Sequence, residues 1–127
     1  MSARQTPYEI LGGDEGIRAL SDAFYDAMDR LETAHDVRAM HQENLGEIKE
    51  KLYEFLSGWL GGPSLYAKKH GTVCLTEPHA PFAIGEKERD QWLECMEAAL
   101  EDIGASDDLR KMVRQPFFMI ADTVRNQ

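Results

Sequence analysis

The sequence has few cysteines, few basic residues and no long apolar run. Only Cys74 and Cys95 are present among its 127 residues, and the opening residues show no apolar signal region. We therefore expect two free thiols and a cytoplasmic location. No apolar run approaches the roughly 18–20 residues that cross a bilayer, which argues against a membrane-spanning chain.

Charge and composition narrow the class further. The chain carries 23 acidic and 14 basic residues, for a net charge of -9. Without a basic stripe to displace counterions, nucleic acids and anionic membranes are poor partners. A hydrophobic content of 43% and a charged content of 29% are ordinary for a globular protein. Since there is no internal repeat and no linker, we expect residues 1–127 to form a single domain.

Three helices are predicted in the N-terminal half, each beginning at a residue that caps helices well. Thr6 begins a short helix that a glycine pair ends. Asp14 is expected to cap the second helix, and Tyr25 lies at the edge of its apolar face, where its hydroxyl either enters a pocket or stays in water. Asn44 is expected to cap the third helix, with Glu47 completing a capping box. The apolar stripe of this third helix is Leu45, Ile48, Leu52, Phe55, Leu56 and Trp59.

Residues 64–85 are poorly patterned and are predicted to be irregular. A stretch of this length in a compact domain usually has a function or a cofactor that orders it. Within it, His79 stands between two prolines and is followed by Phe82 and Ile84. A histidine in a stiff apolar segment suggests a ligand presented to a flat apolar group, for which the candidate is a haem iron. Taken alone, the segment fits an ordinary loop histidine better.

Two further helices are predicted after this segment. Acidic residues from Glu86 onward favour a helix start, and Trp92 lies on the inner face of that helix. Ser106 is expected to cap the last helix, which Pro116 should kink or delay. The chain is therefore expected to be all-α, with four main helices in two antiparallel pairs that could sandwich a flat ligand.

Several motifs in this order resemble a truncated haemoglobin of the second group. The matching stretches are Thr6-Pro7-Tyr8-Glu9, Leu11-Gly12-Gly13, Phe24-Tyr25, Arg38-Ala39-Met40-His41, Lys51-Leu52, Phe55-Leu56-Ser57-Gly58-Trp59-Leu60-Gly61-Gly62-Pro63, Leu65-Tyr66, His79-Ala80-Pro81-Phe82-Ala83-Ile84 and Glu88-Arg89-Asp90-Gln91-Trp92-Leu93-Glu94-Cys95-Met96. They extend over nearly the whole chain, and the glycine pairs, the His-x-Pro-Phe string and the Arg-Asp-x-Trp string are specific. The resemblance implies a truncated globin, a two-over-two helical sandwich around haem b.

The resemblance also implies a role for each matched residue. His79 would be the proximal ligand of the haem iron, and Tyr25, His41 and Trp92 would form the polar distal pocket around the iron-bound ligand. The residues expected to line or pack on the haem are Phe24, Ile48, Leu52, Phe55, Phe82 and Met96. Lys51, and more weakly Tyr66, would contact a haem propionate.

A polar distal pocket implies a tightly held ligand. Iron-bound dioxygen carries partial negative charge, and preplaced donors in a dry pocket stabilise it. Such a site suits chemistry with oxygen, nitric oxide or peroxide better than bulk oxygen transport. Carbon monoxide would also bind, and a nitric oxide dioxygenase-like or peroxidase-like activity with a reductase partner is an open possibility. The sequence leaves open a monomer or a homodimer.

One stretch departs from the family pattern. The family usually places basic residues shortly before the proximal histidine, whereas this chain has Thr72-Val73-Cys74-Leu75-Thr76-Glu77-Pro78 there. Glu77 has the wrong charge for a propionate, so we expect a rearranged loop and weaker retention of haem. Lys68, Lys69 and His70 are candidates to replace the missing contacts.

Three alternatives stay open at this point. The first is a globin fold that has lost haem and serves as an interaction or sensor module. The second is a structural metal site built from His35, His41, His70 and His79, which lacks the usual zinc-binding spacing. In the third, which keeps haem, His41 or Tyr25 binds the iron directly when no gas is present.

Overall fold

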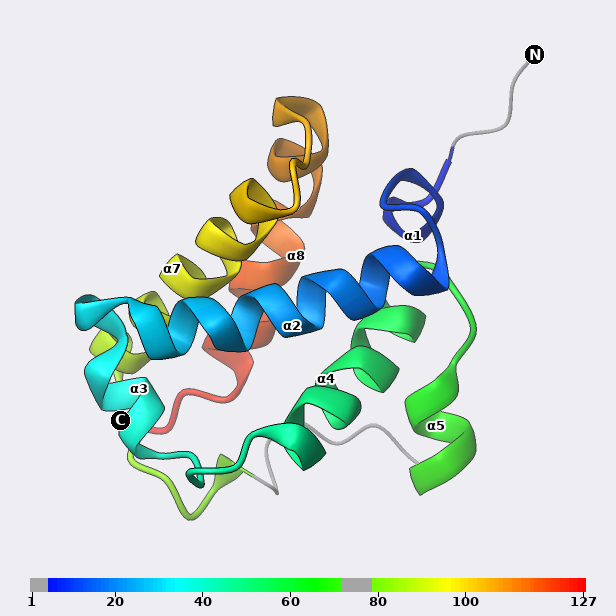
Figure 1. Ribbon diagram of the computed structural model, residues 1–127. Helices are drawn as coiled ribbons and strands as arrows, with labels where there is room; N and C mark the ends of the chain where they lie inside the picture. Colours follow the sequence, from blue (N-terminus) through cyan, green and yellow to red (C-terminus); the bar gives the residue numbers. More distant parts are fainter. Residues whose placement is uncertain (1–4, 72–78) are drawn as a thin grey trace.

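The computed structural model describes residues 5–71 and 79–127, and every regular element in these ranges is a helix (Figure 1). The elements in order are α1 (Pro7–Ile10), α2 (Asp14–Arg30), the 3-10 turn η1 (Glu32–Ala34), α3 (His35–Ala39), α4 (Gly46–Trp59), α5 (Leu65–His70), α7 (Glu86–Asp102) and α8 (Asp107–Thr123). The all-α prediction is confirmed. None of the helices in the described ranges is long and apolar enough to cross a bilayer.

The long helices form two pairs around a shared core. Helix α2 packs on both α4 and α7, and α7 packs in turn on α8 (Figure 1). The short helices η1 and α3 connect α2 to the segment before α4 and also contact α7. This arrangement confirms the predicted sandwich of two helical pairs, α2 with α4 and α7 with α8.

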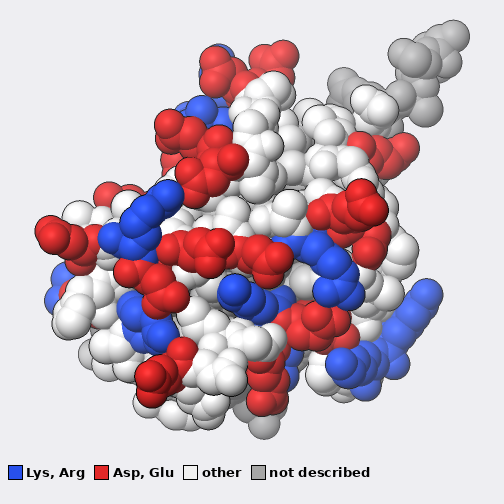
Figure 2. Space-filling model, in the orientation of Figure 1, with Lys and Arg blue, Asp and Glu red and all other residues white. Residues whose placement is uncertain are grey.

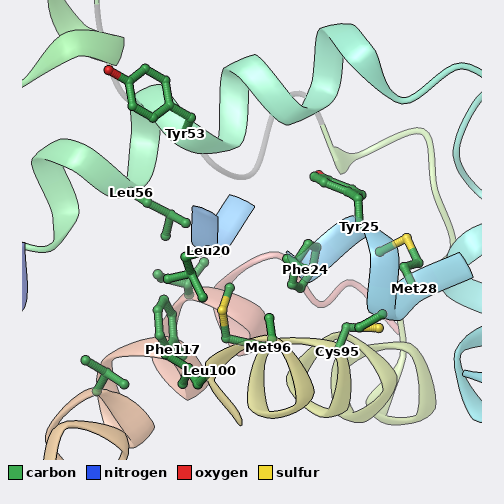
Figure 3. Packing of buried hydrophobic residues seen from close by; sticks show 14 of the residues in the cluster. Leu20, Phe24, Tyr25, Met28, Tyr53, Leu56, Cys95, Met96, Leu100 and Phe117 are labelled. Carbon is green, nitrogen blue, oxygen red and sulfur yellow. The ribbon is translucent and has the colours of Figure 1, made fainter. Parts of the chain in front are cut away.

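The core lies where α2 crosses α7. Side chains that are at most 2% exposed converge there from four helices (Figure 3), namely Ile17, Leu20, Phe24, Leu56, Met96, Leu100, Val113 and Phe117. Removing this much apolar surface from water is the main favourable contribution to folding. The core therefore fixes how α2, which carries Phe24 and Tyr25, sits on α7, which carries Trp92.

Two of the predicted helix starts are confirmed. The Glu9 amide donates to Thr6 Oγ1 at 3.2 Å and the Thr6 amide donates to Glu9 Oε1 at 3.1 Å, which completes the capping box of α1. The Leu109 amide donates to Ser106 Oγ at 3.2 Å at the start of α8. Helix α8 then continues through Pro116 to Thr123.

Two other helix starts differ from the prediction. Gly13, at φ +73°, takes the cap position before α2, and Asp14 lies inside the first turn, where its carboxylate accepts from the Tyr53 hydroxyl. Helix α4 begins at Gly46 instead of directly after Asn44. The Asn44 side chain still accepts from the Gly46 amide at 2.9 Å, but Glu47 faces Lys51 at 3.6 Å and forms no capping box.

The end of α4 and the segment after it also differ from the prediction. Trp59 is 43% exposed, because Leu60, at 3% exposed, takes the inward position at the end of the helix. Residues 64–85 are not wholly irregular, since α5 occupies Leu65–His70. Cys74, Glu77 and Pro78 lie outside the described residues, and the predicted rearrangement of that loop with them.

The first helix, α1, packs against the glycine pair that follows α4. The Tyr8 amide donates to the Leu60 carbonyl at 2.9 Å, and the Tyr8 ring covers Gly62 so closely that a Cβ there would overlap the ring. Gly61 has φ +99°, a conformation that glycine adopts without strain. The N-terminal motif around Tyr8 and the Gly61-Gly62 motif thus form one joint.

Candidate functional site

Tyr25 is a buried tyrosine whose hydroxyl has no hydrogen bond to any residue that the structure describes. It is 4% exposed, extends from α2 toward the side of α4 (Figure 3), and meets Phe24 edge-on with the ring centroids 4.9 Å apart. Burial, with a smaller contribution from the Cys95 thiolate charge, raises the pKa of Tyr25 well above its usual range. The hydroxyl is therefore a protonated donor that can serve a molecule placed beside it.

Trp92 lies next to the same aromatic pair. Its ring centroid lies 5.1 Å from that of Phe24 and 6.1 Å from that of Phe117, so Trp92 borders the core on the α7 side. Phe24 is fully buried and Met96 is 1% exposed. Phe24 thus lies between Tyr25 and Trp92, and it brings these two potential donors to one region of the molecule.

His41 completes this group on the side of α3. Its ring centroid lies 5.7 Å from that of Tyr25, and its Nδ1 lies 2.8 Å from the Val37 carbonyl oxygen. A carbonyl oxygen only accepts, so Nδ1 carries the proton and Nε2 of the neutral ring is an acceptor. Burial is the largest effect on the pKa of His41, and with the charges of Arg38 and His79 it lowers that pKa. The neutral form is therefore favoured.

Arg38 and Gln91 hold the backbone that carries His41. The Arg38 guanidinium donates to the Gln42 carbonyl at 2.9 Å and to the Glu43 carbonyl at 3.0 Å. Gln91, which is 9% exposed, accepts from the Val37 amide at 3.1 Å and donates to Asp36 at 2.9 Å. Because Gln91 precedes Trp92 on α7, this contact sets α3 against the helix of Trp92.

Helix α4 contributes apolar side chains near this group of residues. Ile48, Leu52 and Phe55 are partly buried against the core. The Phe55 ring stacks on Trp59 with centroids 5.6 Å apart and meets the ring of Tyr66 edge-on at 6.4 Å. The three partly buried side chains thus form an apolar face on α4, and Trp59 extends it toward solvent.

The predicted propionate contacts are in part already paired with carboxylates. Lys51 lies 3.6 Å from Glu47, with its side chain 46% exposed. Glu54 is a buried carboxylate on α4, and Lys69 Nζ and His70 Nε2 each approach one of its oxygens at 3.3 Å. Tyr66 contacts His70 with the ring centroids 4.4 Å apart. Lys69 and His70 therefore tie α5 to α4.

His79 begins the segment that leads into α7. It is partly buried, and its carbonyl accepts from the Phe82 amide at 3.0 Å. Phe82 is 40% exposed, so this ring is not part of the core. In the described part of the chain, no three His, Cys, Asp or Glu side chains gather closely enough to hold a metal ion. The histidine cluster considered as a structural metal site is therefore not assembled.

The comparisons with known proteins agree with this geometry. A family model described as bacterial-like globin matches residues 6–126. The group 2 truncated hemoglobin YjbI of Bacillus subtilis is 34% identical over 107 residues, which cover 84% of this chain and 78% of that protein. The chain belongs to the truncated haemoglobin family, in its second group.

Solved structures of truncated haemoglobins share the whole fold. The cold-adapted truncated hemoglobin of Pseudoalteromonas haloplanktis TAC125 is 43% identical with a TM-score of 0.91, covering 97% of this chain and 99% of that one. The group II 2-on-2 hemoglobin of Agrobacterium tumefaciens is 39% identical with a TM-score of 0.92, covering 99% and 98%. As a truncated haemoglobin, the chain is a haem protein of the class that binds diatomic gases such as oxygen.

The residues present fit a haem. The groups that haem proteins use are a buried tyrosine whose hydroxyl has no partner among the described residues, aromatic and aliphatic side chains on α2, α4 and α7, and an imidazole at position 79. Sequence reasoning missed Arg38 and Gln91, which hold the backbone around His41 in this truncated haemoglobin. Their signal is position, since each belongs to a motif that also contains His41 or Trp92.

Proposed function

We propose that this truncated haemoglobin binds haem b with His79 as the proximal ligand and holds an iron-bound gas with Tyr25 and Trp92. The observation that carries the proposal is Tyr25, a residue that is 4% exposed and whose hydroxyl makes no hydrogen bond within residues 5–71 and 79–127. Because the ring is buried and the hydroxyl makes no bond within these residues, the hydroxyl is available to donate to an acceptor that a ligand supplies. When bound, haem supplies the iron that coordinates the gas.

The distal residues divide the work between donors and an acceptor. With haem bound, the Tyr25 hydroxyl and the Trp92 indole N–H would donate to the ligand, whereas Nε2 of neutral His41 would accept. Nε2 of His41 would therefore accept a hydrogen bond from the Tyr25 hydroxyl or from a protonated ligand, and it would donate only after protonation. Donors to a partly negative dioxygen slow its release.

Slow release of dioxygen favours a reaction of the bound gas over oxygen delivery. We propose that the protein acts on dioxygen, nitric oxide or peroxide, in the manner of a nitric oxide dioxygenase or a peroxidase, with electrons from a reductase. Carbon monoxide would bind as an inert ligand. Tyr25, Trp92 and His41 provide the hydrogen bonds and the proton acceptor that such reactions need.

The walls of the site would pack on the macrocycle. Ile48, Leu52 and Phe55 would contact it from α4, and Phe24 and Met96 from the core. Phe82 is exposed and would cover part of the macrocycle after His79. Lys51 and Tyr66 remain the proposed propionate contacts. Because Lys69 and His70 are engaged with Glu54, they would reach a propionate only by exchanging partners, which supports weaker retention of haem.

The test is an absorption spectrum of the purified protein with added haemin, in the ferric form, after reduction, and after addition of carbon monoxide. We expect a stoichiometric Soret band that shifts with carbon monoxide and weakens in His79→Ala. A six-coordinate reduced spectrum before any gas is added would show that His41 or Tyr25 occupies the ligand position. No specific band at all would overturn the proposal and favour a haem-free interaction or sensor module.

A further inference from the structure

The side chain of Asn126 joins the end of α8 to the segment that follows His79. Its Nδ2 donates to the Phe82 carbonyl at 2.7 Å, and its Oδ1 accepts from the Ile84 amide at 2.9 Å. One amide side chain thus satisfies a backbone acceptor and a backbone donor two residues apart, as a neighbouring strand would. In Figure 1 the chain after α8, in red, ends beside the segment that leads into α7.

The backbone at the same place adds further hydrogen bonds. The amides of Asn126 and Gln127 both donate to the Ile84 carbonyl, at 2.8 and 3.1 Å. Ile84 is 7% exposed, so its polar backbone groups need such partners. Residues 126 and 127 therefore hold residues 82–84 through four hydrogen bonds, two from the Asn126 side chain and two from the backbone.

This contact is supported on the α7 side. Arg89 on α7 donates to Asp122 Oδ1 at 3.0 Å, and Arg125 donates to the same oxygen at 3.0 Å. The Arg89 guanidinium also lies over the Phe118 ring, 5.0 Å from its centroid. The end of α8 is thus bonded to the first turn of α7. These contacts fix the position of Asn126 relative to residues 82–84.

The contact leads directly to His79. The Phe82 amide donates to the His79 carbonyl at 3.0 Å, so Phe82 is bonded to His79 on one side and to Asn126 on the other. Within the described ranges, the hydrogen bonds that reach the backbone of residues 80–84 from outside residues 79–85 come from Asn126 and Gln127 alone. The turn that carries His79 is therefore fixed from the end of α8.

We propose that Asn126 is a positioning residue that sets the orientation and hold of His79 as the proximal haem ligand. The proposal rests on the proposed function, because His79 must first bind the iron. It predicts that a change at Asn126 alters the bond between His79 and the iron and the rate of haem release.

The test compares three variants with the wild type after loading with haemin. Asn126→Ala removes both side-chain hydrogen bonds, and Asn126→Asp keeps the acceptor for the Ile84 amide but loses the donor to Phe82. The matched control is Ser106→Ala, which removes a side-chain bond to a backbone amide at the other end of α8. Thermal unfolding of each apo-protein shows which variants fold.

Two readouts separate positioning from stability. Haem transfer to an excess of a tightly binding apo-globin measures release, and resonance Raman spectroscopy of the reduced protein measures the iron–histidine stretching band. We expect Asn126→Ala to release haem about three- to tenfold faster, as the loss of one to two modest hydrogen bonds implies, and to shift the band. Asn126→Asp should lie between Asn126→Ala and the wild type.

Each outcome decides the proposal. An unchanged Raman band and release rate in Asn126→Ala, with haem bound in both proteins, would overturn the positioning role and leave the proposed function standing. A Ser106→Ala variant that shifts the band equally would also overturn it, because the effect would then follow stability. If the wild type bound no haem, the proposed function would fail, and this inference with it.

Discussion

The centroid of the His41 ring lies 5.7 Å from that of the Tyr25 ring, and the two ring planes meet at 70°. The surroundings act on these two groups in opposite directions, since burial raises the pKa of the Tyr25 phenol and lowers the pKa of the His41 imidazole. Both side chains are therefore held in their neutral forms near neutral pH. Under the proposed function, these neutral groups would offer hydrogen bonds to an uncharged diatomic gas without adding a full charge.

We expect Tyr25→Phe and Trp92→Phe each to speed dioxygen dissociation. A hydrogen bond to a partly charged acceptor contributes about 1.5–3 kcal/mol, which corresponds to about a ten- to hundredfold change in rate. Stopped-flow mixing of the oxygenated protein with excess carbon monoxide measures the rate. Tyr8→Phe is the control, because the Tyr8 ring packs over Gly62 and, in the part of the chain that the structure describes, is not among the rings that meet Phe24, Tyr25 or Trp92. Unchanged rates in both variants would contradict slow release by these donors.

The stability of the apo-protein should depend on pH through His41. Its pKa is lowered in the folded state, so the unfolded chain binds the proton more readily, and stability rises with pH. The contribution is fully present above the unfolded value of about 6.5 and is lost as pH falls through the lowered folded pKa. Urea unfolding at several pH values between about 5 and 8 measures it. The slope should be smaller in His41→Gln, and an equal slope in both proteins would refute this assignment.

The buried carboxylate of Glu54 predicts an asymmetry between two kinds of substitution. Glu54→Gln removes the charge and leaves Lys69, with a side chain 60% exposed, free to turn into water, so it should cost only about 1 kcal/mol. Replacing Lys69 and His70 together by Met and Leu strands a carboxylate that is 7% exposed. That double variant should cost more, about 2 kcal/mol or above. The free energy of urea unfolding decides, and the reverse order would rule out this account.

The joint between Tyr8 and Gly62 can be tested by a double-mutant cycle. Gly62→Ala should destabilise the protein by about 1–3 kcal/mol, because the added methyl group overlaps the Tyr8 ring. In a Tyr8→Ala background the same substitution should cost much less. Equal costs in the two backgrounds would mean that the backbone, and not the ring, requires glycine there.

Cys95 should be unreactive in the folded protein. It is fully buried, and burial, with a smaller contribution from Glu94, raises the pKa of its thiol to about 11. In a Cys74→Ser variant at about pH 8, where a free thiol near 8.5 reacts readily, a thiol reagent should label no cysteine until urea is added. Rapid labelling without urea would show that α7 opens far more often than its packing implies.

The sequence predicted much of the fold because periodicity and capping act locally. The stripes of α2, α7 and α8 supply Phe24, Met96 and Phe117 to the core. Thr6 and Ser106 cap their helices as predicted. Cys95 is a free thiol. The errors lie at helix ends, where Asp14 entered the first turn of α2, α4 began at Gly46, and Trp59 turned outward. These ends depend on contacts with other elements, which a local pattern does not contain.

The pairing of surface charges was less predictable from the sequence than the packing of the core. Acidic side chains are spread over the face in Figure 2 with Lys and Arg among them, as the net charge of -9 indicates. The pairing of those charges was not readable from composition. Arg18 meets Glu50 at 3.2 Å and Lys49 meets Asp26 at 3.9 Å, and both pairs join α2 to α4.

By itself, the sequence determined that this protein is all-helical, that it is a truncated haemoglobin, and that most of the apolar residues at helical spacing pack into its core. These properties follow from residue type and spacing. Only the tertiary structure decided that His41 offers an acceptor through its bond to the Val37 carbonyl, that Glu54 engages Lys69 and His70, and that Asn126 holds the segment after His79. The reason is physical, since each of these depends on a hydrogen bond or an ion pair whose partner is chosen by the packing of whole helices.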